Sequence, residues 1–544
     1  MAQSYVVSGK VVDVFLRKII NADLYVRDGL IHEIRESSRE YQKYILPGFV
    51  DAHVHIESSM LIPSGFARAA VRQGTVATVS DPHEIANVMG VEGVRFMIRN
   101  GEKTPFKFFF GAPSCVPATP FESSGAVIDS GEIARLIRNE DIYFLAEMMN
   151  FPGVINNDAE VLRKIKLAQE AGKPVDGHAP GLSGEGLKKY ADQNISTDHE
   201  CSSMEEALEK IKEGMMIQIR EGSAAKNFEN LFPLIHDYSD NIMFCTDDCH
   251  PDDLIRGHIN KIVARAVEKG ADLFDVLHAA LINPVKHYSL KVGLLQPGDP
   301  ADFIVVPDLK TFDVEKTFIN GELVFENNRV LIPPVDEQAA NCFNAKKLCP
   351  ENIFVPAKGR KINVIVARDG ELLTGQELVE AKIENGHVVA DTDHDILKIV
   401  VVNRYTPSKP AVGFVKNFNL NRGAIAGSIA HDSHNIIAIG TNDKDIVQAI
   451  NTIIDYKGGI VACDENDLEI LPLDVAGLMS REDAETVAQK YDRVSKKAKA
   501  FGSRLNAPFM TMAFMALLVI PELKIGDQGL FDVSKFEFSS LFGE

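Results

Sequence analysis

The chain has 544 residues, of which 45% are hydrophobic and 25% charged, and its formal net charge is −20 at pH 7. This apolar fraction is typical of a folded protein and argues against disorder. The negative charge argues against binding to a nucleic-acid backbone, because phosphates are bound by basic surfaces. It does not exclude an enzyme that acts on a neutral nucleobase.

The cysteines and the apolar runs indicate where the protein works. Seven cysteines without a CxxC pair are too few for a disulfide scaffold and are typical of a reducing compartment. The first residues, MAQSYVVSGK, lack the pattern of a signal peptide, and the apolar run 509–520 is too short to span a bilayer. We therefore expect a cytoplasmic protein with no membrane partner.

Both flanks of the first half of the chain have the texture of short strands. Apolar and polar residues alternate within residues 4–46. The same alternation returns after residue 290, where Asn320-Gly321 predicts a tight hairpin. We expect the segments 1–46 and 291–345 to form one small β-sandwich domain.

The middle of the chain alternates short apolar strands with amphipathic helices. About eight such units in residues 47–290 predict an α/β fold, a (β/α)₈ barrel of the TIM type. A run of prolines between Pro333 and Pro356 marks a linker. Beyond it, residues 346–544 are predicted to form a third, α/β domain.

Chemistry-bearing side chains occur where predicted barrel strands end, which is where barrel enzymes place their active sites. The first motif, PGFVDAHVHIESS, contains His53 and His55. Residues i and i+2 of a strand share a face, so these two imidazoles can chelate one metal ion. An isolated HxH is more often a pair of ordinary polar residues, but the preceding PGFVDA strengthens the metal interpretation.

Three more strand ends carry one candidate each. Glu147 ends the apolar strand of FLAEMMN, and a carboxylate buried there needs a partner or a metal. His178 in PVDGHAPG and His199 in ISTDHECSS are separated by about one βα unit, which places them on neighbouring strands. Taken alone, each of the three is more often a satisfied polar residue than a ligand.

The last strand end is NIMFCTDDCH, with Asp247 and Asp248. An aspartate here can bind a metal ion and accept a proton from water. Alternatively it caps the helix that follows, and one of the two residues can do each job. Cys245 and Cys249 flank this pair, but CxxxC is a poor metal-site pattern.

In this order, HxH, Glu, His, His and Asp resemble the metal site of the amidohydrolase superfamily. There the fourth strand gives a carboxylate or a carbamylated lysine, and Glu147 in that place argues against the dihydroorotase and hydantoinase branches. Longer stretches, including TVATVSDPHEIANVMG and FCTDDCHPDDL, resemble the adenine deaminase family. The tail resembles that family's C-terminal domain, so the resemblance covers nearly the whole chain.

The resemblance implies hydrolysis of adenine to hypoxanthine and ammonia by a homodimer. It implies two divalent ions per subunit, Mn²⁺ or Fe²⁺ with Zn²⁺ as an alternative. Asp247 would accept the proton of water and pass it to the leaving amine. The implied metal ligands are His53, His55 and Asp247 on one ion, His178 and His199 on the other, and Glu147 bridging them.

The segment SDPHE and Glu57, two residues after His55, offer further site residues. Attack at C6 of adenine builds charge on N1, so a nearby acid should help, and Glu84 is the favoured candidate. Asp81, His83 and Glu57 are candidate substrate-binding residues. The alternative is that Asp81 caps a helix begun by His83 and Glu84, and that Glu57 caps another.

The tail contains a histidine pair in AHDSHN, His431 and His434. The resemblance makes this segment a possible lid, but a structural role is favoured, and the pair is left outside the core site.

Two other functions remain open. One is an amidohydrolase that cleaves an amide or a cyclic amide. The other is a non-catalytic relative that binds or assembles, which the six occupied ligand positions disfavour. The chain lacks GxGxxG, Walker A and GxSxG motifs and the PCxxC of cytidine-type deaminases.

Overall fold

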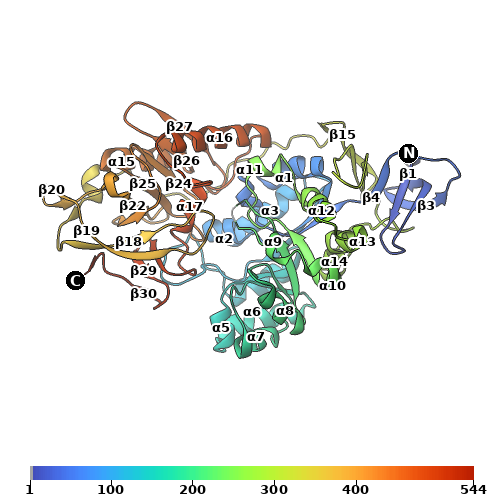
Figure 1. Ribbon diagram of the computed structural model, residues 1–544, viewed down its shortest axis with the longest axis horizontal. Helices are drawn as coiled ribbons and strands as arrows, with labels where there is room; N and C mark the ends of the chain where they lie inside the picture. Colours follow the sequence, from blue (N-terminus) through green and yellow to red (C-terminus); the bar gives the residue numbers. More distant parts are fainter. Residues whose placement is uncertain (1–3, 224, 544) are drawn as a thin grey trace. The chain divides into compact units, whose positions relative to one another are not determined.

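The computed structural model describes residues 4–223 and 225–543 (Figure 1). The chain forms two compact units, and the second contains Glu84–Gly93, Cys115–Ile128 and the residues from Gln338 onward. The first unit contains the rest of the chain up to Glu337. The sequence had placed 84–93 and 115–128 with the barrel, so the structure differs from that expectation.

The first unit contains the predicted barrel. Its eight short strands are all parallel to their neighbours and follow one another in chain order. They are β5 (Phe49–Val54), β6 (Thr75–Ser80), β7 (Lys107–Ala112), β8 (Ile142–Met148), β9 (Val175–Gly177), β10 (Thr197–Asp198), β11 (Met216–Arg220) and β12 (Ile242–Cys245).

Two isolated parallel bridges join the five-stranded sheet β5–β9 to the three-stranded sheet β10–β12. Val175 bridges Ile195 on one side, and Val54 bridges Asp247 on the other. The ring of strands is thereby closed, which confirms the TIM-type barrel. Parallel strands in a closed ring bring all their carboxyl ends to one rim.

Helices follow most of the barrel strands (Figure 1). Aspartate or serine N-caps accept hydrogen bonds from the first turn at Asp129, Asp158, Ser203 and Asp272, which fixes where those helices begin. The helices are α1 (Pro63–Ala70), α2 (His83–Met89), α3 (Val91–Gly101), α4 (Ser130–Asn139), α5 (Phe151–Ile155), α6 (Ala159–Glu170), α7 (Gly184–Ala191), α8 (Met204–Lys212), α9 (Phe228–Leu231), α10 (Leu234–Asp237), α11 (Pro251–Leu254), α12 (Ile259–Glu268), α13 (Leu273–Leu277) and α14 (Asn283–His287).

Short 3₁₀ and π segments complete this layer. They are η1 (Ile56–Ser59), η2 (Val71–Gln73), η3 (Ser239–Asn241) and the π-helical η4 (His278–Ile282).

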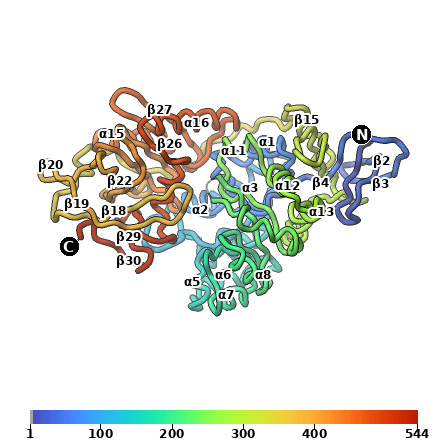
Figure 2. Tube along the Cα trace, viewed as in Figure 1, coloured from blue at the N-terminus to red at the C-terminus, as the bar shows by residue number. Residues whose placement is uncertain are grey.

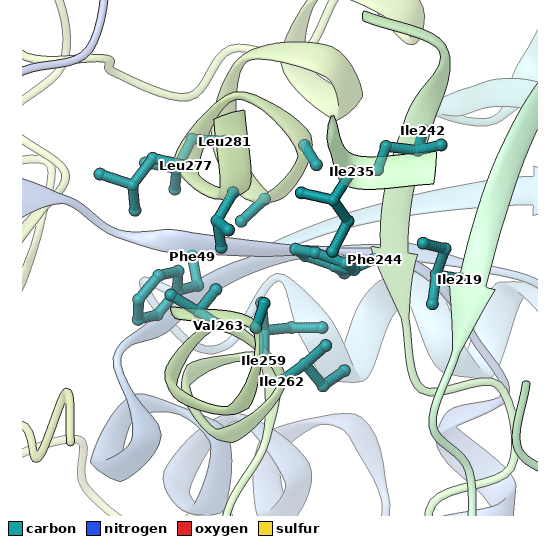
Figure 3. Close-up of a cluster of buried hydrophobic side chains, with 14 of the residues drawn as sticks. Phe49, Ile219, Ile235, Ile242, Phe244, Ile259, Ile262, Val263, Leu277 and Leu281 are labelled. Atoms are coloured by element: carbon teal, nitrogen blue, oxygen red, sulfur yellow. The ribbon is translucent and has the colours of Figure 1, made fainter. Parts of the chain in front are cut away.

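A hydrophobic core packs these helices on the barrel strands (Figure 3). Phe244 of β12, Ile235 of α10, Ile259 of α12 and Leu281 of η4 all belong to this cluster, and none of the four is exposed. This packing holds the barrel strands in place, and with them the polar residues at their carboxyl ends.

The flanks of the barrel pair into one sheet of eight strands, ordered β16-β15-β14-β13-β4-β1-β2-β3. Buried residues of both halves, such as Leu24 and Phe303, share one core cluster. The predicted β-sandwich is therefore built as one continuous sheet whose halves pack together. Its strands are β1 (Ser4–Asp13), β2 (Lys18–Arg27), β3 (Leu30–Glu36), β4 (Tyr44–Pro47), β13 (Phe303–Val306), β14 (Lys316–Ile319), β15 (Glu322–Glu326) and β16 (Arg329–Val330).

The hairpin predicted at Asn320-Gly321 joins β14 to β15, with Ile319 paired to Glu322. Both turn residues have positive φ, 47° and 74°, which is what a two-residue hairpin turn of the primed type requires.

The C-terminal unit is built on a mixed sheet ordered β19-β18-β23-β22-β25-β24-β26-β27, with β31 (Phe542–Gly543) on β18. Figure 2 labels its strands β18, β19, β22, β26 and β27 along the trace of the chain. Its fully buried strand β22 (Ile396–Val402) lies inside the sheet. The other strands are β18 (Lys361–Val366), β19 (Gly375–Glu380), β23 (Ala411–Lys416), β24 (Ala424–Gly427), β25 (Ile436–Gly440), β26 (Gly459–Cys463) and β27 (Leu468–Pro472).

Helix α15 (Asp443–Tyr456) packs on β24, β25 and β26, and α16 (Ala484–Ala500) on β26 and β27. This mixture confirms an α/β C-terminal domain. Its smaller elements are α17 (Pro508–Phe514), η5 (Pro350–Ile353), η6 (Thr392–His394), the sheet of β17 (Val355–Pro356), β21 (His387–Val388) and β20 (Ile383–Glu384), and the sheet of β28 (Leu523–Gly526), β29 (Gly529–Asp532) and β30 (Glu537–Phe538).

Across the described residues, none of the helices combines the length and the apolar character needed to cross a membrane. The seven cysteines, all in the described part of the chain, are free thiols.

Candidate metal centre

The six residues predicted as metal ligands come together at the carboxyl rim of the barrel. His53 is in β5 and His55 directly follows it, while Glu147 is the penultimate residue of β8. The others come one or two residues after the fifth, sixth and eighth strands of the barrel, and all six side chains are buried or nearly so. These last three are His178, His199 and Asp247.

Backbone hydrogen bonds hold Asp247 beside the HxH motif. The amide of His55 donates to the carbonyl of Asp247 at 3.1 Å, and the amide of Asp247 donates to the carbonyl of His53 at 2.9 Å. The Nε2 atoms of His53 and His55 are 3.3 Å apart and lie 3.4 and 3.0 Å from Oδ1 of Asp247. Three potential ligand atoms thus share one small space.

Glu147 faces different histidines with its two oxygens. Its Oε1 lies 3.3 Å from Nε2 of His55, and its Oε2 lies 2.7 Å from Nδ1 of His178 and 3.2 Å from Nε2 of His199. One carboxylate therefore links the HxH motif to the second pair of histidines. This is the arrangement that a carboxylate bridging two ions requires.

The donor set fits divalent metal ions. Imidazole and carboxylate ligands together suit Zn, Fe, Mn and Co. His55 is oriented by its Nδ1, which lies 3.1 Å from the backbone carbonyl of Asp81, leaving Nε2 directed into the cluster. Among the described residues, Nδ1 of His53 and Nδ1 of His199 have no hydrogen-bond partner although both rings are buried. The imidazoles and carboxylates therefore converge with a donor set that can bind metal.

The carboxylates and imidazoles of the cluster shift one another's pKa. Burial raises the pKa of Glu147, but the charge and hydrogen bonds of His178 and the bonds of His199 outweigh it and hold that pKa well below its usual range. Burial also raises the pKa of Asp247, and the Arg220 guanidinium reverses the effect, so this pKa too is well below its usual value. Burial lowers the pKa of His53. Burial also acts to lower the pKa of His55, His178 and His199, but the hydrogen bonds and charges of the neighbouring carboxylates outweigh it and raise all three.

Asp81 and His83, the candidate substrate-binding residues after β6, lie in the same cluster. Nδ1 of His83 is 3.1 Å from Oδ2 of Asp81 and 3.4 Å from Oε1 of Glu147. Asp81 also accepts a hydrogen bond from the amide of His83, the first residue of α2. Glu57, in η1, is buried.

Asp247 and Asp248 do separate jobs. Asp247 lies in the cluster with a φ of 55°, whereas Asp248 accepts a hydrogen bond from Oγ of Ser58. Neither caps the next helix, because α11 has His250 as its N-cap.

Glu84 lies in the C-terminal unit. It directly follows His83, but its side chain pairs with His431 and His434. The structure thus places the candidate acid with the histidine pair that the sequence left outside the core site.

Two residues of the centre, Arg220 and Glu200, are not among those that the sequence predicts. Arg220, the last residue of β11, donates from Nη1 to Oδ2 of Asp247 at 2.7 Å and to Glu200, which follows His199. The same strand-end rule that selected the ligands points to both of them. Oε1 of Glu200 lies 3.5 Å from Nε2 of His199.

Asp51, inside the PGFVDAH motif, links residues of the first and last barrel strands near the metal centre. It accepts hydrogen bonds from the amide and hydroxyl of Thr246, the residue that directly follows β12. Its Oδ2 also lies 3.1 Å from Nε2 of His258. This network ties β5 to β12 directly beneath His53 and Asp247.

Comparisons with known proteins agree with this geometry. Residues 44–324 match the model of the Amidohydrolase family, and residues 371–537 match that of the Adenine deaminase C-terminal domain. Relatives called adenine deaminase include those of Methanosarcina acetivorans (55% identical, over 98% of this chain and 99% of theirs), Salinibacter ruber (52%, over the whole of both) and Borreliella burgdorferi (50%, 97% and 98%).

Proposed function

Because this chain belongs to the adenine deaminase family of amidohydrolases, we propose that its metal centre hydrolyses adenine to hypoxanthine and ammonia. The observation that carries the proposal is the convergence of the six ligand candidates, with each oxygen of Glu147 facing different histidines. The near full-length relatives support adenine as substrate and not the amide substrates of other amidohydrolases.

His53, His55 and Asp247 would hold one ion, His178 and His199 a second, and Glu147 both. The family resemblance favours Mn²⁺ or Fe²⁺, and Zn²⁺ suits the same ligands. Divalent ions bound there supply Lewis acidity and lower the pKa of water from about 15.7 towards about 7.

Asp247 is placed to move the proton. Its Oδ2 is held by Arg220 at 2.7 Å, while Oδ1 faces the HxH histidines. Burial raises the pKa of its carboxyl, but the charge of Arg220 outweighs burial and holds the pKa well below its usual value, which leaves the carboxylate ionised and able to accept a proton. We assign it the transfer of a proton from the attacking water to the amino group that leaves as ammonia.

The role of Glu84 as the acid that protonates N1 of adenine stays a prediction. Burial raises the pKa of Glu84, but the charges of His431 and His434 outweigh this and hold it well below the usual range. Glu84 would therefore have to gain a proton before it donated one. Asp81, His83 and Glu57 remain proposed substrate-binding residues, with Asp81 and His83 supported by their place beside Glu147.

The test uses chelator-stripped protein reloaded with Mn²⁺ or Fe²⁺ and supplied with adenine. We expect hypoxanthine and ammonia in equal amounts, and the more active ion identifies the preferred metal. Glu147→Gln and His178→Ala should lose both activity and metal, because each removes a ligand. His236→Ala, on α10 outside the cluster, is the control and should match the unmodified enzyme.

Two outcomes would contradict the proposal. If adenine is inert while N-acyl or cyclic amides are cleaved, the alternative amidohydrolase function holds. If Glu147→Gln keeps full activity and metal content, the centre is assigned wrongly. Light scattering on the same samples tests the expected homodimer, and fractionation of cells tests the expected cytoplasmic location.

A further inference from the structure

A second group of metal-ligating side chains lies within the C-terminal unit. It consists of Glu84, His431 and His434, each of which offers a ligand atom within 4.8 Å of the others. All three side chains are more than nine-tenths buried, at 4, 8 and 1% exposure. The metal centre of the barrel uses none of them.

The two histidines approach the two oxygens of Glu84 separately. Nδ1 of His431 is 2.9 Å from Oε1, and Nε2 of His434 lies against Oε2. The ring of His431 stacks on Phe514 with centroids 5.2 Å apart, which fixes its direction. Among the described residues, Nδ1 of the buried His434 ring has no hydrogen-bond partner. The ligand atoms of the three buried side chains thus converge on one place, where they could hold a metal ion.

The loop that carries both histidines is held rigidly in place. The hydroxyl of Tyr405 donates to the carbonyl of Ser433 at 2.6 Å, and the side-chain amide of Asn435 donates to the carbonyl of Ser123 at 2.9 Å. A ligand set on such a braced loop needs little rearrangement to bind an ion.

Buried acidic groups around the loop favour a cation. Glu122, Asp432 and Asp527 are all buried in the same unit. Burial raises the pKa of Glu122 well above its usual value, and the neighbouring charges of Asp432 and Asp527 raise it further. Arg404 is the guanidinium nearby, and it donates to the carbonyl of Ala476. A raised pKa favours the neutral form of Glu122, and a cation bound nearby would oppose this shift and favour the ionised carboxylate.

We propose that Glu84, His431 and His434 bind one divalent transition-metal ion, of the Zn²⁺ class, separate from the ions of the barrel centre. Two imidazoles and one carboxylate are a ligand set that zinc takes in proteins, with a fourth position open to water or a ligand. Burial lowers the pKa of His434 to about 4, so its imidazole is neutral, which is the form that binds metal. Glu84 would bind this ion through its ionised carboxylate. It could then not carry the proton that its predicted role as an acid requires.

The test measures metal content by difference in the full chain. Protein is saturated with Zn²⁺, passed through a desalting column and analysed by mass spectrometry for zinc per chain. His434→Ala should carry one zinc fewer than the unmodified chain. In a His178→Ala background, which weakens the barrel centre, the same substitution should still remove one zinc. The barrel assignment can therefore fail without affecting this difference.

The control is His394→Ala, an exposed histidine of the same unit that pairs with Asp391. It should keep the full zinc content. If His434→Ala does not fold, anomalous diffraction from zinc-soaked crystals of the unmodified chain replaces it, and a peak is expected between Glu84, His431 and His434. Equal zinc in folded His434→Ala and the unmodified chain, or no peak at that place, overturns the proposal and leaves an ion-paired Glu–His cluster.

Discussion

Arg220 neutralises two buried carboxylates at the rim of the barrel, those of Asp247 and Glu200. Burying a charge without a counter-charge costs free energy of folding. We therefore expect the stability of the protein to depend on the Arg220 guanidinium, which pairs with residues that follow β10 and β12.

Arg220→Met removes the guanidinium that both buried carboxylates share, and we expect a loss of about 3–5 kcal/mol in the free energy of unfolding. Chemical denaturation measures it. The matched control is Arg256→Met, because Arg256 is two-thirds exposed and pairs with Asp252 and Asp253 on the surface. That change should cost less than about 1 kcal/mol. Similar costs for the two variants would mean that Arg220 is not a structural counter-charge.

Lys524 gives the C-terminal unit a stability that depends on pH. Its ammonium is fully buried, donates to the carbonyls of Leu372 and Phe514, and has a pKa lowered by burial from 10.5 to about 7. Between these two values the unfolded chain binds a proton that the folded chain does not bind. Stability contributed by this group therefore rises as pH increases from about 7 to about 10.5.

Lys524→Met removes that titration. The thermal midpoint of the unmodified protein minus that of the variant should increase between pH 7 and pH 9.5. Lys496→Met, at an exposed lysine of α16, is the control, and its difference should stay constant over the same range. A constant difference for Lys524→Met as well would refute the depressed pKa.

At the scale of elements, the stability of the barrel depends on the packing of η4 against β12. Leu281, in the π-helical η4, is fully buried in the cluster of Figure 3. Leu281→Ala should cost about 3–5 kcal/mol, through lost burial and the cavity left behind. Leu16→Ala, at a leucine that is 66% exposed, should change stability by less than about 0.5 kcal/mol. Comparable effects of the two substitutions on denaturation would show that this core is loosely packed.

The convergence of the six ligand candidates could be predicted because its signals are local. His53 and His55 share one face of one strand, and Glu147, His178, His199 and Asp247 each lie at the end of an apolar run with the pattern of a strand. The topology rule for parallel barrels then brings the ends together. The partnership of Arg220 with Glu200 and Asp247 could not be read in this way, because it depends on three strand ends meeting at one point.

The segments 84–93 and 115–128 show a second limit. Their periodicity is that of ordinary helix and loop within a barrel, and it says nothing about which distant residues they contact. The amide of Ser123 donates to Asp527, and Asn435 donates to the carbonyl of Ser123. Contacts at such separations in sequence have no local signature, so the structure alone reveals that these segments belong to the C-terminal unit.

At the scale of the whole molecule, the two units interleave along the chain. A chain ending at residue 337 keeps every ligand of the barrel centre but removes the partners of 84–93 and 115–128. We expect it to aggregate or to purify with little bound metal, as judged by gel filtration and metal analysis. A monodisperse truncated chain with the metal content of the full chain would contradict this expectation.

The eight-stranded sheet imposes an order in time on the growing polypeptide. Strand β4 lies in the interior of that sheet, where Leu46 pairs with Ile304 of β13. The ribosome completes β4 long before β13 emerges, so one side of β4 stays an unpaired apolar edge during most of synthesis. Nascent chains that stall between the two strands are therefore the species most exposed to wrong pairing, and the point in synthesis at which a chaperone gives the greatest protection.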